Sequence, residues 1–199
     1  MKNLIIGIAI ATTTLAACNS GSKNSAENIK TDDTMKVDNS MAKDATPPNN
    51  STLKSDGAMT EMVTQYLQIK NALANDNGKD AASAGDAFVE SMGKMDKNSI
   101  PADKKKTWDN ISDDAKEMAE HIAKNADKIE HQREHFDMLS KDMYDMVKSF
   151  GSGQTLYQDF CPMYNDKKGA TWLSETKQIK NPYFGKKMPT CGSIKEEIK

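Results

Sequence analysis

Residues 127–150 read DKIEHQREHFDMLSKDMYDMVKSF and carry the clearest helical pattern of the chain. Apolar and long side chains recur every three or four residues, which places them on one face of an α-helix. Asp127 and Glu130 have the spacing of a capping box, which predicts the start of this helix. The glycines at 151 and 153 predict its end. The expected core face consists of Ile129, Arg133, Phe136, Ser140, Met143, Val147 and Phe150.

Three earlier stretches repeat this spacing and predict helices over residues 59–75, 79–96 and 101–125. Asn75-Asp76-Asn77-Gly78 separates the first two, and Pro101 opens the third, since proline is tolerated in a first helical turn. Four amphipathic helices joined by short connections are typical of an antiparallel bundle. We therefore expect an all-α fold in which an antiparallel four-helix bundle occupies residues 58–153.

The helical period stops after Gly153, and residues 154–199 have a different composition. Six of the twelve aromatic residues lie between Tyr157 and Phe184. Such an aromatic density favours burial over solvation. We expect an irregular, aromatic-rich C-terminal segment of the same domain, packed on the bundle without a substantial sheet. Trp172, Tyr183 and Phe184 should be buried there.

The N-terminal residues 1–17 have the layout of a signal peptide, with a basic start followed by a short apolar run. Leu15-Ala16-Ala17-Cys18 resembles the lipobox of bacterial lipoproteins, in which the cysteine is lipidated; an ordinary secretory signal is the alternative. Residues 18–57 are rich in Ser, Asn, Lys and Asp and lack apolar periodicity, which predicts a disordered tether. We expect an extracytoplasmic protein, anchored through Cys18 to a bacterial membrane and facing the periplasm.

The overall charge is nearly balanced, with 27 basic and 29 acidic residues. A balanced charge gives no excess of positive charge to attract a polyanion, so we expect no nucleic-acid partner. The sequence also contains no cysteine-protease signature and no serine elbow. These absences favour a binding protein over an enzyme.

Two short elements after the predicted bundle combine thiols with thioethers. Cys161 and Met163 flank a proline, and Met188 and Cys191 enclose Pro189-Thr190. Soft sulfur ligands favour Cu(I) or another soft metal ion, so these four side chains are candidate metal ligands. The alternative is a Cys161–Cys191 disulfide, because two cysteines in an oxidising compartment commonly pair. The spacing alone leaves both interpretations open.

His131 and His135 are four residues apart, so their rings share one face of the predicted helix. This face points away from the expected core, which favours an ordinary solvated surface. Alternatively, the C-terminal segment folds across it and brings one histidine to Cys161 or Met188 as a further metal ligand. His121 has no companion at such a spacing and is expected at the surface.

Arg133 falls on the core face, where a buried guanidinium needs a partner. Asp86 on the second predicted helix is one candidate. Backbone carbonyls of the C-terminal segment are the other. In either case Arg133 is expected to have a structural role.

Several motifs resemble the domain-of-unknown-function family numbered 3347. The helical motifs are residues 66–73, YLQIKNAL, and 131–136, HQREHF; the C-terminal motifs are residues 161–163, CPM, 168–174, KGATWLS, and 179–185, IKNPYFG. The resemblance runs from about Met59 to Ile198. Members of this family occur alone in lipoproteins and fused to periplasmic adaptor subunits of heavy-metal efflux pumps. The resemblance therefore implies copper or silver handling, with a metal-efflux system as the partner, although this chain lacks the hairpin and barrel segments of those adaptors.

Two functions from different classes follow. The first is a membrane-anchored, extracytoplasmic module that binds a soft metal ion, with ligands among Cys161, Met163, Met188, Cys191, His131 and His135. The second is a metal-free structural or interaction lipoprotein with a Cys161–Cys191 disulfide.

Overall fold

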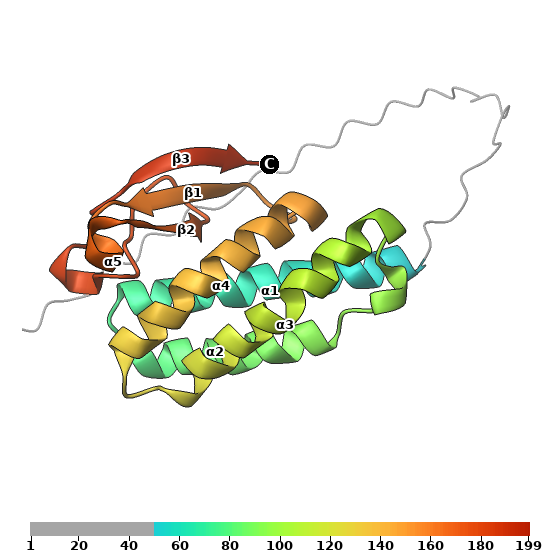
Figure 1. Cartoon of the computed structure of the whole chain (residues 1–199), viewed down its shortest axis with the longest axis horizontal. Coiled ribbons are helices and arrows are strands. Elements are labelled where there is room, and N and C mark those ends of the chain that lie inside the picture. The colour runs from blue at the N-terminus through green and yellow to red at the C-terminus, as the bar shows by residue number, and fades with distance from the viewer. Residues whose placement is uncertain (1–49) are drawn as a thin grey trace, which may run out of the picture. The chain divides into compact units, whose positions relative to one another are not determined.

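The structure is a computed structural model that describes residues 50–199, with side-chain surroundings given from residue 57 onward. Four long helices come first, and a short sheet follows them (Figure 1). The helices are α1 (Asn50–Ala74), α2 (Gly78–Gly93), α3 (Ala102–Lys124), α4 (Ile129–Phe150) and the single turn α5 (Tyr164–Lys167), with 3₁₀ turns η1 (Lys97–Ser99) and η2 (Gly185–Lys187). The strands are β1 (Leu156–Cys161), β2 (Ala170–Ser174) and β3 (Ser193–Ile198).

The four long helices pack side by side, with α1 against α2, α2 against α3, α3 against α4, and α4 against α1. The prediction of a mostly helical fold is therefore confirmed. The backbones of α2 and α3 approach closely at Gly85, where an added Cβ would lie 2.9 Å from the carbonyl oxygen of Ala119. A larger residue at this position would push the two helices apart.

The C-terminal segment differs from its prediction as irregular structure, because it forms a three-stranded antiparallel sheet with the order β2-β1-β3. Cys161 pairs with Ala170 on one side of the central strand, and Leu156 pairs with Ile198 on the other. β2 packs on α4 and α1, so the sheet covers that side of the helices (Figure 1). The prediction was wrong because these strands have five or six residues each, and long-range pairing rather than local periodicity defines them.

Two predicted boundaries also differ. α1 begins at Asn50, inside the range assigned to the tether. The predicted capping box at the start of α4 is not formed, because Lys128 occupies the N-cap position and makes no side-chain cap bond. The carboxylate of Glu130 instead accepts a hydrogen bond from Nη1 of Arg133 at 3.0 Å. The guanidinium of Arg133 thus binds the Glu130 carboxylate, which the capping box would have required.

One continuous core joins the helices to the sheet. The Tyr66 hydroxyl on α1 lies 2.8 Å from the Ser140 hydroxyl on α4, and it accepts the backbone N–H of Leu173 on β2 at 2.9 Å. Trp172 and Tyr183 are each 1% exposed, which confirms their predicted burial. Phe184 is only partly buried and packs against the same core. The aromatic density of the C-terminal segment therefore provides the contact between the two layers.

Arg133 fixes the C-terminal segment to the helices, and here the prediction of a carbonyl partner is confirmed. Its Nε donates to the carbonyl of Pro182 at 2.8 Å. Its Nη2 donates to the carbonyl of Leu73 at 3.1 Å and to the carboxylate of Asp76 at 2.6 Å. Asp86, the other predicted partner, is exposed on α2 and does not take part.

Gly185 closes this arrangement. Its φ of +51° suits glycine, and an added Cβ would collide with the Asp76 carboxylate and with Nη2 of Arg133. The chain therefore passes close to the ion pair only because no side chain is present at this position.

The predicted signal peptide, the lipidation site Cys18 and most of the predicted tether lie outside the described residues. Among residues 50–199, none of the helices has the length and hydrophobicity needed to cross a bilayer.

Candidate metal centre

Three histidines come together between α3 and α4. His121 belongs to α3, whereas His131 and His135 lie one turn apart on α4. One ligand nitrogen from each ring lies within 4.8 Å of the others. The Nε2 atoms of His131 and His135 are 3.1 Å apart, and the rings of His121 and His135 stack with centroids 4.2 Å apart. The side chains are part-exposed, so an ion from solution has access to this group of nitrogens.

Each imidazole has a further polar neighbour. Nδ1 of His135 lies 3.3 Å from the thioether sulfur of Met118, and Nδ1 of His131 lies 3.3 Å from the Glu134 carboxylate. Glu117 is 3.8 Å from Nε2 of His121. Because a thioether only accepts hydrogen bonds, the Met118 contact places the proton of a neutral His135 on Nδ1. Nε2 of His135 then keeps its lone pair.

The turn between α3 and α4 explains why these residues meet. His121 precedes the end of α3 at Lys124 by three residues, and His131 follows the start of α4 at Ile129 by two. Residues at matched distances from a short turn face each other when two helices run antiparallel. The prediction that His121 has no companion was therefore wrong, although its side chain is 43% exposed, as expected of a surface residue. Its position relative to the turn is the signal that could have identified it.

The electrostatic environment favours neutral imidazole at His135. Partial burial, followed by the nearby charges of His121 and His131, lowers the pKa of His135. A lowered pKa keeps this ring uncharged over a wider pH range. Neutral imidazole is the form that binds a metal ion.

Cys161 and Cys191 also come together, at the end of the sheet. Their Sγ atoms are 2.9 Å apart, and both are free thiols. Cys161 is fully buried on β1, whereas Cys191 is half-buried in the loop before β3. The contact with Cys161, and then burial, raises the pKa of the Cys191 thiol to about 11. The sequence therefore identified a real pair, and its spacing did not distinguish a dithiol from a metal site.

The predicted methionine ligands lie at the surface. Met163 is 43% exposed and Met188 is 36% exposed. Both contact Cys191 through their backbones: the Met188 carbonyl accepts the Cys191 N–H at 3.2 Å, and the Met163 backbone hydrogen-bonds to the Cys191 thiol.

The histidines and the cysteines lie apart, so the alternative in which the C-terminal segment folds across the histidine face is not what the structure shows. Within the described part of the chain, the metal-ligating group contains His121, His131 and His135 without either thiol. The reason is that the sheet packs on α4 and α1 through β2, whereas the two histidines of α4 face His121 on α3. The candidate nitrogen and sulfur ligands therefore form two groups.

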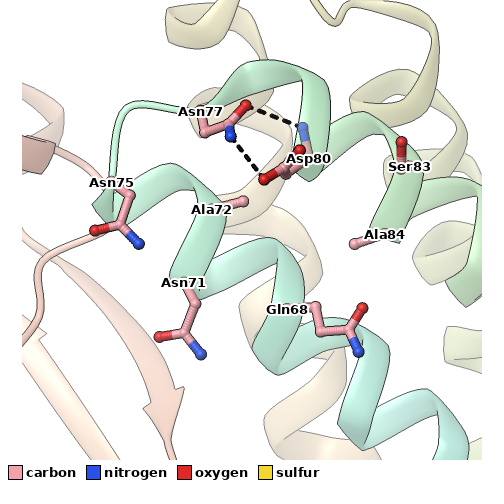
Figure 2. A pocket seen from close by; sticks show the side chains of 8 residues that line it. All are labelled: Gln68, Asn71, Ala72, Asn75, Asn77, Asp80, Ser83 and Ala84. Atoms are coloured by element: carbon pink, nitrogen blue, oxygen red, sulfur yellow. Dashed lines mark hydrogen bonds between the residues drawn. The ribbon is translucent and has the colours of Figure 1, made fainter. Parts of the chain in front are cut away.

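A separate cavity of about 460 Å³ lies between α1 and α2 (Figure 2). Carboxamides line much of it, including those of Gln68, Asn71 and Asn75. Asn71 is already engaged, because its Nδ2 donates to the Glu175 carboxylate at 3.0 Å. Figure 2 also shows that Asn77 hydrogen-bonds to both the backbone and the carboxylate of Asp80, which caps α2. The lining contains no histidine or cysteine, so this cavity is a weaker candidate for metal chemistry than the histidine group.

Residues 62–155 match the model of the family described as "Protein of unknown function (DUF3347)". The match includes all three histidines and ends before β1, so the C-terminal motifs that contain Cys161 and Cys191 lie beyond it. No curated protein and no solved structure matches the chain.

Proposed function

We propose that this protein is a metal-binding module that holds one copper ion between α3 and α4. The ligands are His121, His131 and His135. The observation that carries the proposal is the convergence of one nitrogen from each ring to within 4.8 Å. Three protein ligands with an open fourth position suit an ion that is taken up and passed on, because the open position admits an exchanging ligand.

The spacing of the nitrogens supports an ion at this position. Two imidazole nitrogens at about 2.0–2.1 Å from one tetrahedral ion stand about 3.3 Å apart. The Nε2 atoms of His131 and His135 are 3.1 Å apart. Binding thus requires only a small opening of the pair. Neutral rings that carry their protons on Nδ1 leave a free lone pair on both Nε2 atoms, as a metal ligand requires.

The neighbours of the histidines support the same role. Metal-ligating histidines commonly donate their second N–H to a carboxylate or another acceptor, which fixes the ring and its tautomer. Glu134 is placed for this at Nδ1 of His131, and Met118 at Nδ1 of His135. Glu117 lies 3.8 Å from Nε2 of His121 and adds a negative charge beside the group.

Copper is the ion that this ligand set favours among the common divalent metals. Imidazole suits copper, zinc, nickel and iron, and affinity for nitrogen sites peaks at Cu²⁺. Cu(I) and silver belong to the same proposal, since soft-metal handling is what the family resemblance implies. The proposed ligands thus change from the cysteines and methionines to the histidines. The proposed class of metal, copper or silver, stays the same.

The cellular role that we propose rests on the N-terminal sequence. A lipid anchor at Cys18 would hold the domain outside the cytoplasm at a bacterial membrane, and residues 19–49 would give it reach. There the module would collect copper for a metal-efflux system by ligand exchange. We interpret α1–α4 as an antiparallel four-helix bundle, an architecture in which metal sites are commonly built from side chains on facing helices.

A competition titration with a copper chelator tests the proposal on the full chain. The wild type should take up one equivalent at the histidine site, and His121→Gln and His135→Gln should each weaken uptake by roughly 100-fold or more. The Cys161→Ser, Cys191→Ser double variant is the matched control and should keep the wild-type affinity. If the cysteine variant loses copper and the histidine variants keep it, the ion belongs to the sulfur group. If the wild type takes up no copper, the metal-free structural role becomes the better account.

A further inference from the structure

The Cys161–Cys191 pair has a geometry that differs from that of two ligands on one ion. Two thiolates at about 2.3 Å from a tetrahedral metal stand about 3.8 Å apart. The sulfurs of a disulfide are about 2.05 Å apart. The observed separation of 2.9 Å lies between these values and is too short for two ligands of one ion. The thiols are therefore positioned to bond to each other.

The surrounding backbone holds Cys191 in place without a covalent bond. Nδ2 of Asn181 donates to the Cys191 carbonyl at 2.7 Å, and the Asn181 N–H donates to the Pro189 carbonyl at 2.9 Å. Cys161 is held from the other side by its pairing with Ala170 in the sheet. Ring closure between the two sulfurs consequently requires little backbone movement.

The two thiols differ in access. Cys161 is fully buried beneath the sheet, whereas Cys191 is half-buried and lies between exposed stretches of the loop. A partner molecule can reach the second sulfur far more easily than the first. This difference in access is what a stepwise exchange requires, with one thiol that reacts with the partner and one that resolves the intermediate. Access sets the order of reaction even though the contact with Cys161 raises the pKa of Cys191 and so lowers its thiolate fraction.

We propose that Cys161 and Cys191 form an oxidation site that exchanges with the disulfide of a thiol–disulfide oxidoreductase, with Cys191 reacting first. The Cys191 thiolate attacks one sulfur of the partner disulfide, which forms a mixed disulfide and releases the other partner sulfur as a thiolate. The Cys161 thiolate then attacks Sγ of Cys191, which forms the Cys161–Cys191 bond and releases the second partner thiolate. The two cysteine protons end on the released thiolates, so two thiols of this chain are oxidised and one partner disulfide is reduced.

The bond would secure the segment that contains Pro182 and Tyr183. These residues lie between the two cysteines in sequence and pack on α4 through Arg133 and Phe136. A disulfide closes this loop and so reduces the conformational entropy of the unfolded chain. Oxidation should therefore raise the thermal midpoint of the domain, and it should do so independently of copper at the histidine site.

Oxidised glutathione is the probe for the test, applied to the reduced full chain in a Cys18→Ser background that removes the third thiol. Alkylation and mass spectrometry should show an intramolecular Cys161–Cys191 link in the parent. The Cys161→Ser variant should accumulate a glutathione adduct on Cys191, about tenfold faster or more than Cys191→Ser accumulates one on Cys161. Circular dichroism checks that each variant is folded, and Cys161→Ala replaces Cys161→Ser if the latter is not.

Two results would overturn the proposal. The first is a parent protein in which both thiols remain open to alkylation after exposure to the probe. The second is an adduct that forms on Cys161 as fast as on Cys191, which would show that burial does not order the reaction. Linked peptides from the parent test ring closure even where a cysteine variant is unfolded.

Discussion

His121 on α3 stacks on His135 of α4, with ring centroids 4.2 Å apart and ring planes inclined by 14°. This contact joins two helices at a part-exposed position outside the hydrophobic core. Two imidazoles in contact repel each other once both are charged. The arrangement therefore suits rings that are neutral and share a cation, which links the local packing to the proposed metal site.

Replacing Met118 by leucine should weaken copper binding without removing a ligand. The thioether accepts the Nδ1 proton of His135 at 3.3 Å and so keeps Nε2 free for the ion. Loss of such an outer contact typically reduces affinity by about tenfold. A chelator competition measures the change. Met138→Leu is the matched control, because Met138 is 40% exposed on α4 and should keep the parent affinity; equal losses in the two variants would contradict the role of Met118.

Arg133→Met should destabilise the domain by roughly 3–5 kcal/mol, because it leaves the partners of a buried charge without their donor. The carbonyls of Pro182 and Leu73 both depend on this guanidinium. Urea denaturation measures the free energy of unfolding. Lys124→Met on α3 removes only an exposed ion pair with Glu120 and should leave the free energy of unfolding nearly unchanged. Similar losses in the two variants would show that Arg133 does not anchor the C-terminal segment.

Asp159 should make the domain less stable as the pH rises. It is fully buried on β1 with neither carboxylate oxygen hydrogen-bonded, and burial raises its pKa from 3.8 to about 7. Between pH 4 and 7 the unfolded chain has lost a proton that the folded chain keeps. The free energy of unfolding therefore falls across this window and levels off above it.

Asp159→Asn tests this effect. The variant should lack the decline and should be more stable than the wild type at pH 8 by roughly 2–4 kcal/mol, with the difference vanishing towards pH 4. Asp113→Asn, at an exposed position of α3, should leave the pH dependence unchanged. An Asp159→Asn profile parallel to that of the wild type would contradict the assignment.

The sequence predicted the helices well because their core faces repeat locally. In α4, the side chains of Phe136, Met143 and Val147 are buried as their spacing indicated. The sheet could not be predicted in this way. Its edge strand β3 reads SIKEEI, which has few apolar residues, and it exists because Leu156 and Tyr157 of β1 pair with its last residues. Pairing between distant segments has no local signature.

The candidate site was predicted in part. The four-residue spacing of His131 and His135 placed both rings on one helix face, which was expected to be a solvated surface and, alternatively, to supply a metal ligand. The sequence did not show which element that face meets, because the direction depends on how α3 returns along α4. The cysteine pair was identified from its expected location: the N-terminal sequence predicts an oxidising compartment, where two thiols commonly pair. Its separation of 2.9 Å, which is shorter than two ligands of one ion require, is visible only in the structure.

X-ray absorption spectroscopy of the full chain loaded with one equivalent of copper tests the central claim most directly, because it identifies the atoms bound to the ion. The proposed site predicts nitrogen neighbours at about 2.0 Å with the outer-shell scattering of imidazole rings, and no sulfur in the first shell. His135→Gln should reduce the imidazole signal. A first shell of sulfur at about 2.3 Å, unchanged in His135→Gln and lost in the double cysteine variant, would contradict the account and return the ion to Cys161 and Cys191.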